Sequence, residues 1–169
     1  MKESISRFIT KRLKLKVNEA KSAVSYPWWR KYLGFSFTST RGKTRIRIHS
    51  KSFKRFKDRV RELTGRSCGR SIWQVVQKLN DYVRGWWNYY RHTETRSFLR
   101  SLNGWIMRRL RAIIWKHWKN RRTRVRELEK RGVYHDTAVR AGCSRKGPWR
   151  MSRVKWVMAA CTVALAYHF

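Results

Sequence analysis

Residues 71–91 read SIWQVVQKLNDYVRGWWNYYR and combine a helical apolar pattern with a dense group of aromatic residues. Ser71 followed by Gln74 is typical of the capping box that starts a helix. The apolar residues that follow recur at helical spacing: Ile72, Val75, Val76, Leu79, Val83, Trp86 and Tyr90. At about 100° per residue they form one stripe. The segment therefore predicts a long amphipathic helix whose apolar face packs in a core.

The aromatic rings of RGWWNYYR, residues 84–91, could pack in that core or offer a surface for stacking. Trp86 and Tyr90 continue the stripe and Trp87 lies at its margin, so we expect these rings to face the core. Three residues fall together on the opposite face at spacing i, i+4, i+7: Arg84, Asn88 and Arg91. We expect the helix to present this face outward.

Helical spacing also marks the segments on either side. The helix before it, which stops near Gly65, has its stripe at Phe53, Phe56, Val60 and Leu63. The longer helix after it has its stripe at Phe98, Leu102, Ile106, Leu110 and Ile113. A short fourth helix is indicated by Gly132 between Leu128 and Val133, the arrangement of a Schellman C-cap. Three such stripes can bury one another in a helical bundle.

The first 49 residues predict a different unit, a helix followed by a β-hairpin. Residues 3–16 have an amphipathic helical pattern, whereas residues 32–49 alternate with period two around a turn at Gly42. The alternating apolar residues are Leu33, Phe35 and Phe37 in the first strand, and Ile46 and Ile48 in the second. The predicted fold class is mainly α: a helical bundle preceded by a helix and a β-hairpin.

The chain carries 43 Lys and Arg against 9 Asp and Glu, a formal net charge of +34. A chain with this charge repels itself until a polyanion neutralises it. Its aromatic content of 14%, with 10 Trp, is too high for a disordered basic tail, because such segments are poor in rings. These two properties predict a folded protein that binds RNA or DNA.

Other classes of protein fit the sequence less well. The apolar run at residues 156–167 would span roughly 18 Å as a helix, against the ~30 Å of a bilayer core. The N-terminus has no visible secretory signal. The cysteines stand apart from one another: Cys68, Cys143 and Cys161. Their spacing argues against disulfides and structural zinc. We therefore expect a cytoplasmic protein with no metal, cofactor or membrane partner, whose C-terminal run is a packed helix.

The segment RRLRAIIWKHWKNRR, residues 108–122, is the better candidate for base stacking. Four residues fall on the far side of its helix, away from the apolar stripe: Arg111, Trp115, Trp118 and Arg122. Two outward tryptophans on a basic face would contribute about 1–3 kcal/mol for each stacked base. The alternative is that another element, such as the C-terminal helix, covers both rings.

The remaining cations predict a surface that neutralises phosphates without reading the base sequence. The residues that we assign to this role are Lys54, Arg55, Arg61, Arg108 and Lys119. Neutralising about six to ten phosphates would give a log–log salt slope of about −4 to −9.

Several motifs follow one another in a recognisable order: N-x-x-KS at residues 18–22, YLGFSF, a basic helix ending in RELT, SIWQVVQKLNDYVRGWWNYY, WIMRRLRAIIWKHW and GPWRMS. Together they resemble the C-terminal part of a bacterial group II intron reverse transcriptase/maturase. The resemblance covers essentially the whole chain and is most specific at LN-x-x-x-RGW-x-NYY. It implies that residues 1–49 come from the end of the palm and residues 50–150 form the thumb and the maturase-specific domain X. Residues 151–169 would be a C-terminal apolar helix.

The resemblance also implies roles for two groups of residues. Leu33, Gly34 and Phe35 would lie where the family positions a primer end, in a primer-grip-like hairpin. Residues 84–91 would belong to the maturase motif, in a region that grips structured intron RNA.

The family's polymerase centre contains a Tyr-Ala-Asp-Asp turn, and this sequence has no Asp-Asp pair. Two-metal nucleotidyl transfer needs carboxylates that bridge the cations. The paired cysteines of the family's endonuclease extension are also absent. We therefore expect that the isolated chain is not an enzyme. Met1 falls where the family has continuous palm sequence, which suggests a truncated or split reading frame or a gene remnant.

The leading hypothesis is a maturase-type RNA-binding fragment that assists the folding or splicing of a group II intron, with the intron RNA as its partner. Two alternatives stay open. The chain could complete a split RNA-directed DNA polymerase whose palm carboxylates lie on a separate fragment. It could also be a degenerate product that binds nucleic acids without specificity.

Overall fold

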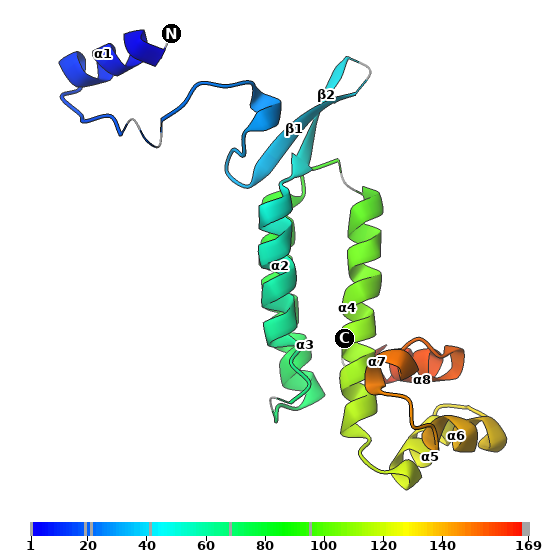
Figure 1. Ribbon diagram of the computed structural model, residues 1–169. Helices are drawn as coiled ribbons and strands as arrows, with labels where there is room; N and C mark the ends of the chain where they lie inside the picture. The colour runs from blue at the N-terminus through cyan, green and yellow to red at the C-terminus, as the bar shows by residue number, and fades with distance from the viewer. Residues whose placement is uncertain are drawn as a thin grey trace. The chain divides into compact units, whose positions relative to one another are not determined.

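The computed structural model describes residues 2–18, 20, 22–40, 42–67, 69–94 and 96–166 (Figure 1). The chain folds into two compact units, Met1–His49 and Ser50–Phe169. As predicted, the fold is mainly helical, with a helix and a two-stranded hairpin in the first unit. The predictions that involve Met1, Glu19, Lys21, Arg41, Cys68 and residues 167–169 fall, at those positions, outside the described residues.

The first unit contains α1 (Lys2–Arg12), a single 3-10 turn η1 (Pro27–Trp29) and the hairpin β1 (Phe35–Thr40) and β2 (Lys43–Ile48). The strands are antiparallel, with Phe35 opposite Ile48 and Phe37 opposite Ile46. Gly42 has φ +73°, the left-handed conformation that glycine adopts without steric cost. The predicted hairpin and its turn are therefore confirmed. Helix α1 is shorter than the predicted 3–16, and none of its residues is buried.

The first strand begins later than the sequence pattern predicts. Leu33 and Gly34 have φ values of +47° and +91°, so both lie in a turn of left-handed conformation rather than in a strand. The Leu33 side chain is 66% exposed. The prediction that Leu33 shares a strand face with Phe35 is wrong, because this local turn outweighs the period-two pattern.

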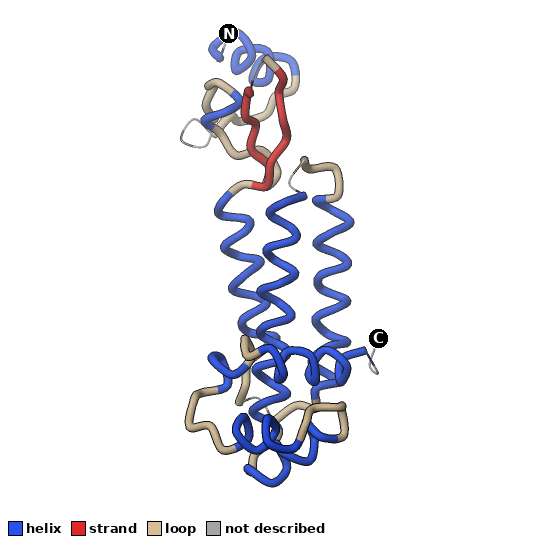
Figure 2. Tube along the Cα trace, turned by 90° about the vertical axis from the view of Figure 1, so that its right-hand side faces the viewer, coloured by secondary structure: helices blue, strands red, loops and turns tan. Residues whose placement is uncertain are grey.

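The second unit begins with three long helices: α2 (Ser50–Leu63), α3 (Ile72–Tyr90) and α4 (Arg96–His117). They lie side by side, with α3 against both α2 and α4 (Figure 2). The predicted stripes meet in the core, where the buried residues include Phe56, Val60, Val75, Val76, Leu79, Leu102, Ile106, Leu110 and Ile113. The side chain of Phe98 lies outside the described residues. The predicted bundle is confirmed.

Helix α3 starts and packs as its sequence predicts. The backbone N–H of Gln74 donates to Ser71 Oγ at 3.3 Å, which satisfies one of the free donors at the helix start. Trp86 packs its ring 4.3 Å from that of Phe56, and Tyr90 is buried beside it. Trp87, at the predicted margin, is exposed. Trp86 and Tyr90 therefore pack in the core as predicted, whereas the expectation that Trp87 faces the core is wrong.

Four further helices follow: α5 (Arg121–Glu129), α6 (His135–Gly142), α7 (Pro148–Met151) and α8 (Lys155–Ala166). They gather around the C-terminal half of α4, where α7 and α8 contact α4, and α5 and α6 contact α8 (Figure 1). The core of this second layer includes Leu128, Ala138, Met151, Val157 and Cys161. In the part of the chain that the structure describes, no helix is long and apolar enough to cross a membrane.

The second layer covers the far side of α4. Trp115 is 0% and Trp118 8% exposed, and their ring centroids lie 5.9 Å apart. The guanidinium groups of Arg124 and Arg131 each lie 5.1 Å from the centroid of one of these rings. The prediction of an outward stacking surface at Trp115 and Trp118 is therefore wrong, and the alternative that other elements cover the rings is confirmed.

Arg111 is also covered by the second layer. It is partly buried beside Cys161 of α8, and burial lowers the pKa of its guanidinium. Burial likewise raises the pKa of the Cys161 thiol to about 12, so this cysteine is an inert core residue. The predicted placement of Arg111 on an outward face is wrong for the same reason as that of the two tryptophans.

The end of α5 has the predicted Schellman geometry. Gly132 has φ +82°, its N–H donates to the carbonyl of Glu129 at 2.9 Å, and the N–H of Val133 donates to that of Leu128 at 3.1 Å. Leu128 and Val133 are both buried. The motif turns the chain from α5 towards α6 and holds Leu128 in the second core.

We expect Trp115→Ala to lower the free energy of unfolding by about 3–5 kcal/mol, because it empties a fully buried site. Chemical denaturation followed by circular dichroism measures the change. Trp29→Ala is the control, since that ring is 77% exposed, and it should cost less than about 1 kcal/mol. Equal losses in the two variants would contradict the burial of Trp115.

We expect Gly132→Ala and Gly85→Ala to change stability in opposite directions. No heavy atom lies within 4 Å of an added Cβ at either position, so backbone conformation alone decides the sign. Gly132→Ala should lower the free energy of unfolding by about 1–2 kcal/mol because its φ is positive. Gly85→Ala, inside α3, should raise it by up to about 1 kcal/mol. Thermal melts of the two variants check this, and shifts of the same sign would exclude the cap.

Candidate nucleic-acid interface

Most of the residues predicted to bind RNA lie at the surface. The exposed ones are Lys54, Arg55, Arg61, Arg84, Asn88, Arg91, Lys119 and Arg122. On α3, Arg84, Asn88 and Arg91 are exposed while Tyr90 is buried, so the predicted outward face of this helix is confirmed. Contact of this face with RNA stays a prediction. The primer-grip-like role of Leu33, Gly34 and Phe35 also stays a prediction.

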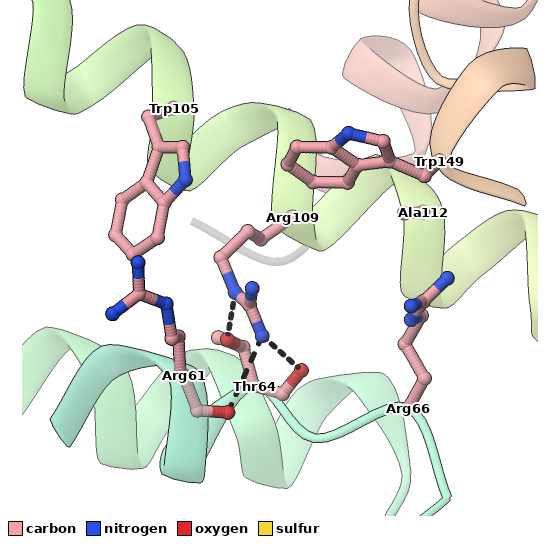
Figure 3. A pocket seen from close by; sticks show the side chains of 7 residues that line it. All are labelled: Arg61, Thr64, Arg66, Trp105, Arg109, Ala112 and Trp149. Carbon is pink, nitrogen blue, oxygen red and sulfur yellow. Dashed lines mark hydrogen bonds between the residues drawn. The ribbon is translucent and has the colours of Figure 1, made fainter. Parts of the chain in front are cut away.

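The second unit contains a pocket of about 390 Å³ between the end of α2, α4 and α7 (Figure 3). Its lining residues are Arg61, Thr64, Arg66, Trp105, Arg109, Ala112 and Trp149. Arginines and indole rings dominate this lining, and it includes no carboxylate. Of the predicted residues only Arg61 belongs to it.

Arg109 of α4 lines the pocket and is fixed by three hydrogen bonds. Its Nε donates to Thr64 Oγ1 at 2.6 Å, and its Nη2 donates to the carbonyls of Arg61 and Thr64 at 3.3 and 3.4 Å. The last carbonyls of a helix lack intrahelical donors and favour a nearby cation, which explains the position of this guanidinium at the C-terminal end of α2. Figure 3 shows the three bonds converging on Arg109. The contact ties α4 to α2.

Two indoles flank Arg109. Trp105, one helical turn before it on α4, has the guanidinium carbons of Arg109 and Arg61 at 5.4 and 5.8 Å from its ring centroid. Trp149 of α7 is held by Arg108, whose guanidinium carbon lies 3.9 Å from the ring centroid and whose Nη2 donates to the Trp149 carbonyl at 3.1 Å. Cation–π contacts at these distances fix the orientation of the rings. The aromatic walls are therefore in place before any ligand enters.

The charges in the pocket are of one sign. Burial lowers the pKa of Arg109, and the neighbouring charges of Arg61 and Arg66 lower it further. Arg61 pairs with Asp58, but both side chains are more than half exposed, and such surface pairs contribute little. Lys116 adds another cation nearby, donating to Ser67 Oγ at 3.0 Å. A site with this charge favours a bound anion.

Most of this pocket is not predicted from the sequence. Trp105 and Arg109 are i, i+4 neighbours, so helical spacing alone could have placed them on one face of α4. Arg66 lies two residues after the basic helix that ends in RELT, and nothing in that segment distinguishes it from the neighbouring cations. Trp149 belongs to the quoted motif GPWRMS, but only the tertiary fold brings α7 against α4. No local signal in the sequence predicts that contact.

Comparison with protein families gives a match over residues 53–132, to the model described as the group II intron, maturase-specific domain. The matched range runs from α2 to the Schellman glycine and includes every pocket residue except Trp149. No curated protein matches the chain. The match confirms, over residues 53–132, the resemblance to a group II intron maturase that was drawn from the sequence motifs.

Proposed function

We propose that the chain, whose residues 53–132 match a group II intron maturase-specific domain, acts in group II intron splicing by binding the intron RNA directly. The pocket of arginines and indoles carries this proposal, since it presents positive charge and aromatic rings at one place. Those are the two chemical features that proteins use to hold unpaired RNA.

In this proposal the intron RNA supplies the splicing chemistry, and the protein supplies binding free energy. A ligand that binds only the folded form of a macromolecule stabilises that form in proportion to its affinity and concentration. Phosphates of the folded intron would lie against exposed cations such as Arg84 and Arg91 on α3. The chain itself would not polymerise DNA, since its sequence has no Asp-Asp pair.

A second candidate function is favoured by the first unit. Several of its apolar side chains are strongly exposed, among them Ile5, Phe8, Trp29 and Leu33. Exposed apolar groups of this size are typical of a surface that a protein partner covers. A separate reverse-transcriptase palm fragment would be such a partner. This candidate requires another protein, whereas the first requires only RNA, so RNA binding by the chain alone separates them.

We expect the purified chain to bind its host's group II intron RNA more tightly than a scrambled RNA of equal length. Filter binding across a salt titration measures this preference. A preference that persists at high salt supports specific binding, because counterion release acts on both RNAs alike. Equal affinities with equal salt slopes would rule out specific recognition by the chain alone.

We expect Arg84→Ala and Arg91→Ala each to weaken binding of the intron RNA and to make the log–log salt slope shallower by about one unit, because each removes one phosphate contact. The same filter-binding titration gives the slope. Tyr134→Ala, at an exposed uncharged residue, is the control and should leave the slope unchanged. An unchanged slope in both arginine variants would remove the outward face of α3 from the interface.

A further inference from the structure

The pocket between α2, α4 and α7 combines its charges and rings within one small cavity. We propose that it binds a single unpaired nucleotide of an RNA, with the base against the indoles of Trp105 and Trp149 and the phosphate at Arg61 and Arg66. The inference rests on the proposed RNA-binding function and names the part of the RNA that this site would hold.

The arginines divide into two kinds. Arg109 donates its Nε–H to Thr64 Oγ1 and its Nη2–H groups to the backbone carbonyls of Arg61 and Thr64. It therefore adds positive charge to the pocket but has few N–H groups left for a ligand. Arg61 and Arg66 are exposed, and Figure 3 shows their guanidinium groups on either side of Arg109, both extending from the α2 side towards α4. Arg61 also pairs with Asp58 through Nη1, but this surface pair contributes little, so a phosphate can compete for the guanidinium. Guanidinium groups bind phosphate oxygens in pairs. The combined charge of Arg61, Arg66 and Arg109 therefore favours a phosphate at the mouth of the pocket.

The indole rings of Trp105 and Trp149 are ordered for stacking on a nucleotide base. Arg108 holds the Trp149 ring, and Trp105 is partly buried against the core, so neither ring needs to be ordered when a ligand arrives. Preorganised groups lose less entropy on binding. Every base presents a π-face, so such a site accepts any base. A volume of about 390 Å³ lies at the lower end of the range for small-ligand pockets, the scale of one nucleotide.

The base must be unpaired. In a duplex the bases stack on one another and present only their edges in the grooves, so their faces cannot reach an indole. A bulged or looped nucleotide can leave the stack and enter a pocket, and its own phosphate follows it. The pocket thus predicts a preference for RNA structure rather than for RNA sequence.

Three RNA hairpins test the proposal with the full chain: a perfect stem, the same stem with one bulged adenosine, and the same stem with an abasic bulge. We expect the bulged stem to bind about 5- to 150-fold more tightly than the perfect stem, the factor that stacking of one base gives. The abasic bulge should lose most of this gain, because it keeps the phosphate but lacks the ring. Fluorescence anisotropy of end-labelled hairpins at fixed salt gives the three affinities.

The double variant Arg61→Gln, Arg66→Gln should reduce the preference for the bulged stem to less than twofold. Both side chains are exposed, so circular dichroism melts should match those of the wild type. The matched control is Arg84→Gln, Arg91→Gln, which removes two exposed charges from α3. It should weaken binding of all three hairpins by the same factor and leave the preference intact.

Equal binding of the three hairpins by the wild type would overturn the nucleotide pocket. If the intron RNA were still preferred over scrambled RNA, the proposed function would stand without it, so the two failures are distinguishable. Adenosine monophosphate serves as a further probe. If it bound the pocket while the three hairpins bound equally, the site would belong to free nucleotides and the RNA assignment would be wrong. An unchanged bulge preference in the Arg61, Arg66 variant would overturn the placement of the phosphate.

Discussion

The C-terminal half of α4 has apolar side chains on more than one side, so other helices must cover it on each of those sides. The rest of the second unit supplies that cover. Leu110 and Ile113 continue the stripe that joins the three-helix bundle, while Trp115 and Trp118 lie under cations of α5 and the turn that follows it. A helix that is apolar over most of its circumference is stable only inside a core. The bundle and the α5–α8 layer are therefore two halves of one hydrophobic core with α4 as the shared element, and the pocket at Arg109 lies where bundle and layer meet.

Because the chain has few carboxylates, the partly buried arginines need other hydrogen-bond acceptors for their N–H groups. With 43 basic and 9 acidic residues, few arginines can have an acidic partner. They bond to backbone carbonyls and stack on indoles instead: Arg109 at the end of α2, Arg108 on Trp149, and Arg124 on the carbonyl of Trp118 at 2.9 Å. Carbonyl bonds satisfy the N–H groups but leave the positive charge uncompensated. The arginines that hold the fold together thus also contribute to the field that attracts a polyanion.

The features that the sequence predicts correctly are local. The Ser71 cap, the Schellman turn at Gly132, the stripes of α2 to α4 and the alternation of the hairpin each depend on residues within one turn or one strand. The failures have non-local or conformational causes. The helical spacing of α4 alone places Trp115 and Trp118 on its outward face. They are buried only because the later helices cover them, and two of those helices are too short to show a periodic pattern. Leu33 has the spacing of a strand residue but adopts a turn. The pocket is lined by residues of α2, α4 and α7. Helical spacing could place Trp105 and Arg109 on one face of α4, but the contact of α7 with that face depends on the tertiary fold.

The shared position of α4 has a consequence for the order in which the protein is made. A ribosome releases α2, α3 and α4 before α5 to α8, and the three helices can pair through their common stripe while the later helices are still being synthesised. Until residues 121–166 have emerged, the two tryptophans at the end of α4 have nothing to cover them, and the nascent chain exposes large apolar rings beside a run of cations. Such surfaces attract chaperones or aggregate. Within the second unit, the second layer therefore closes over a helix that precedes it in the chain.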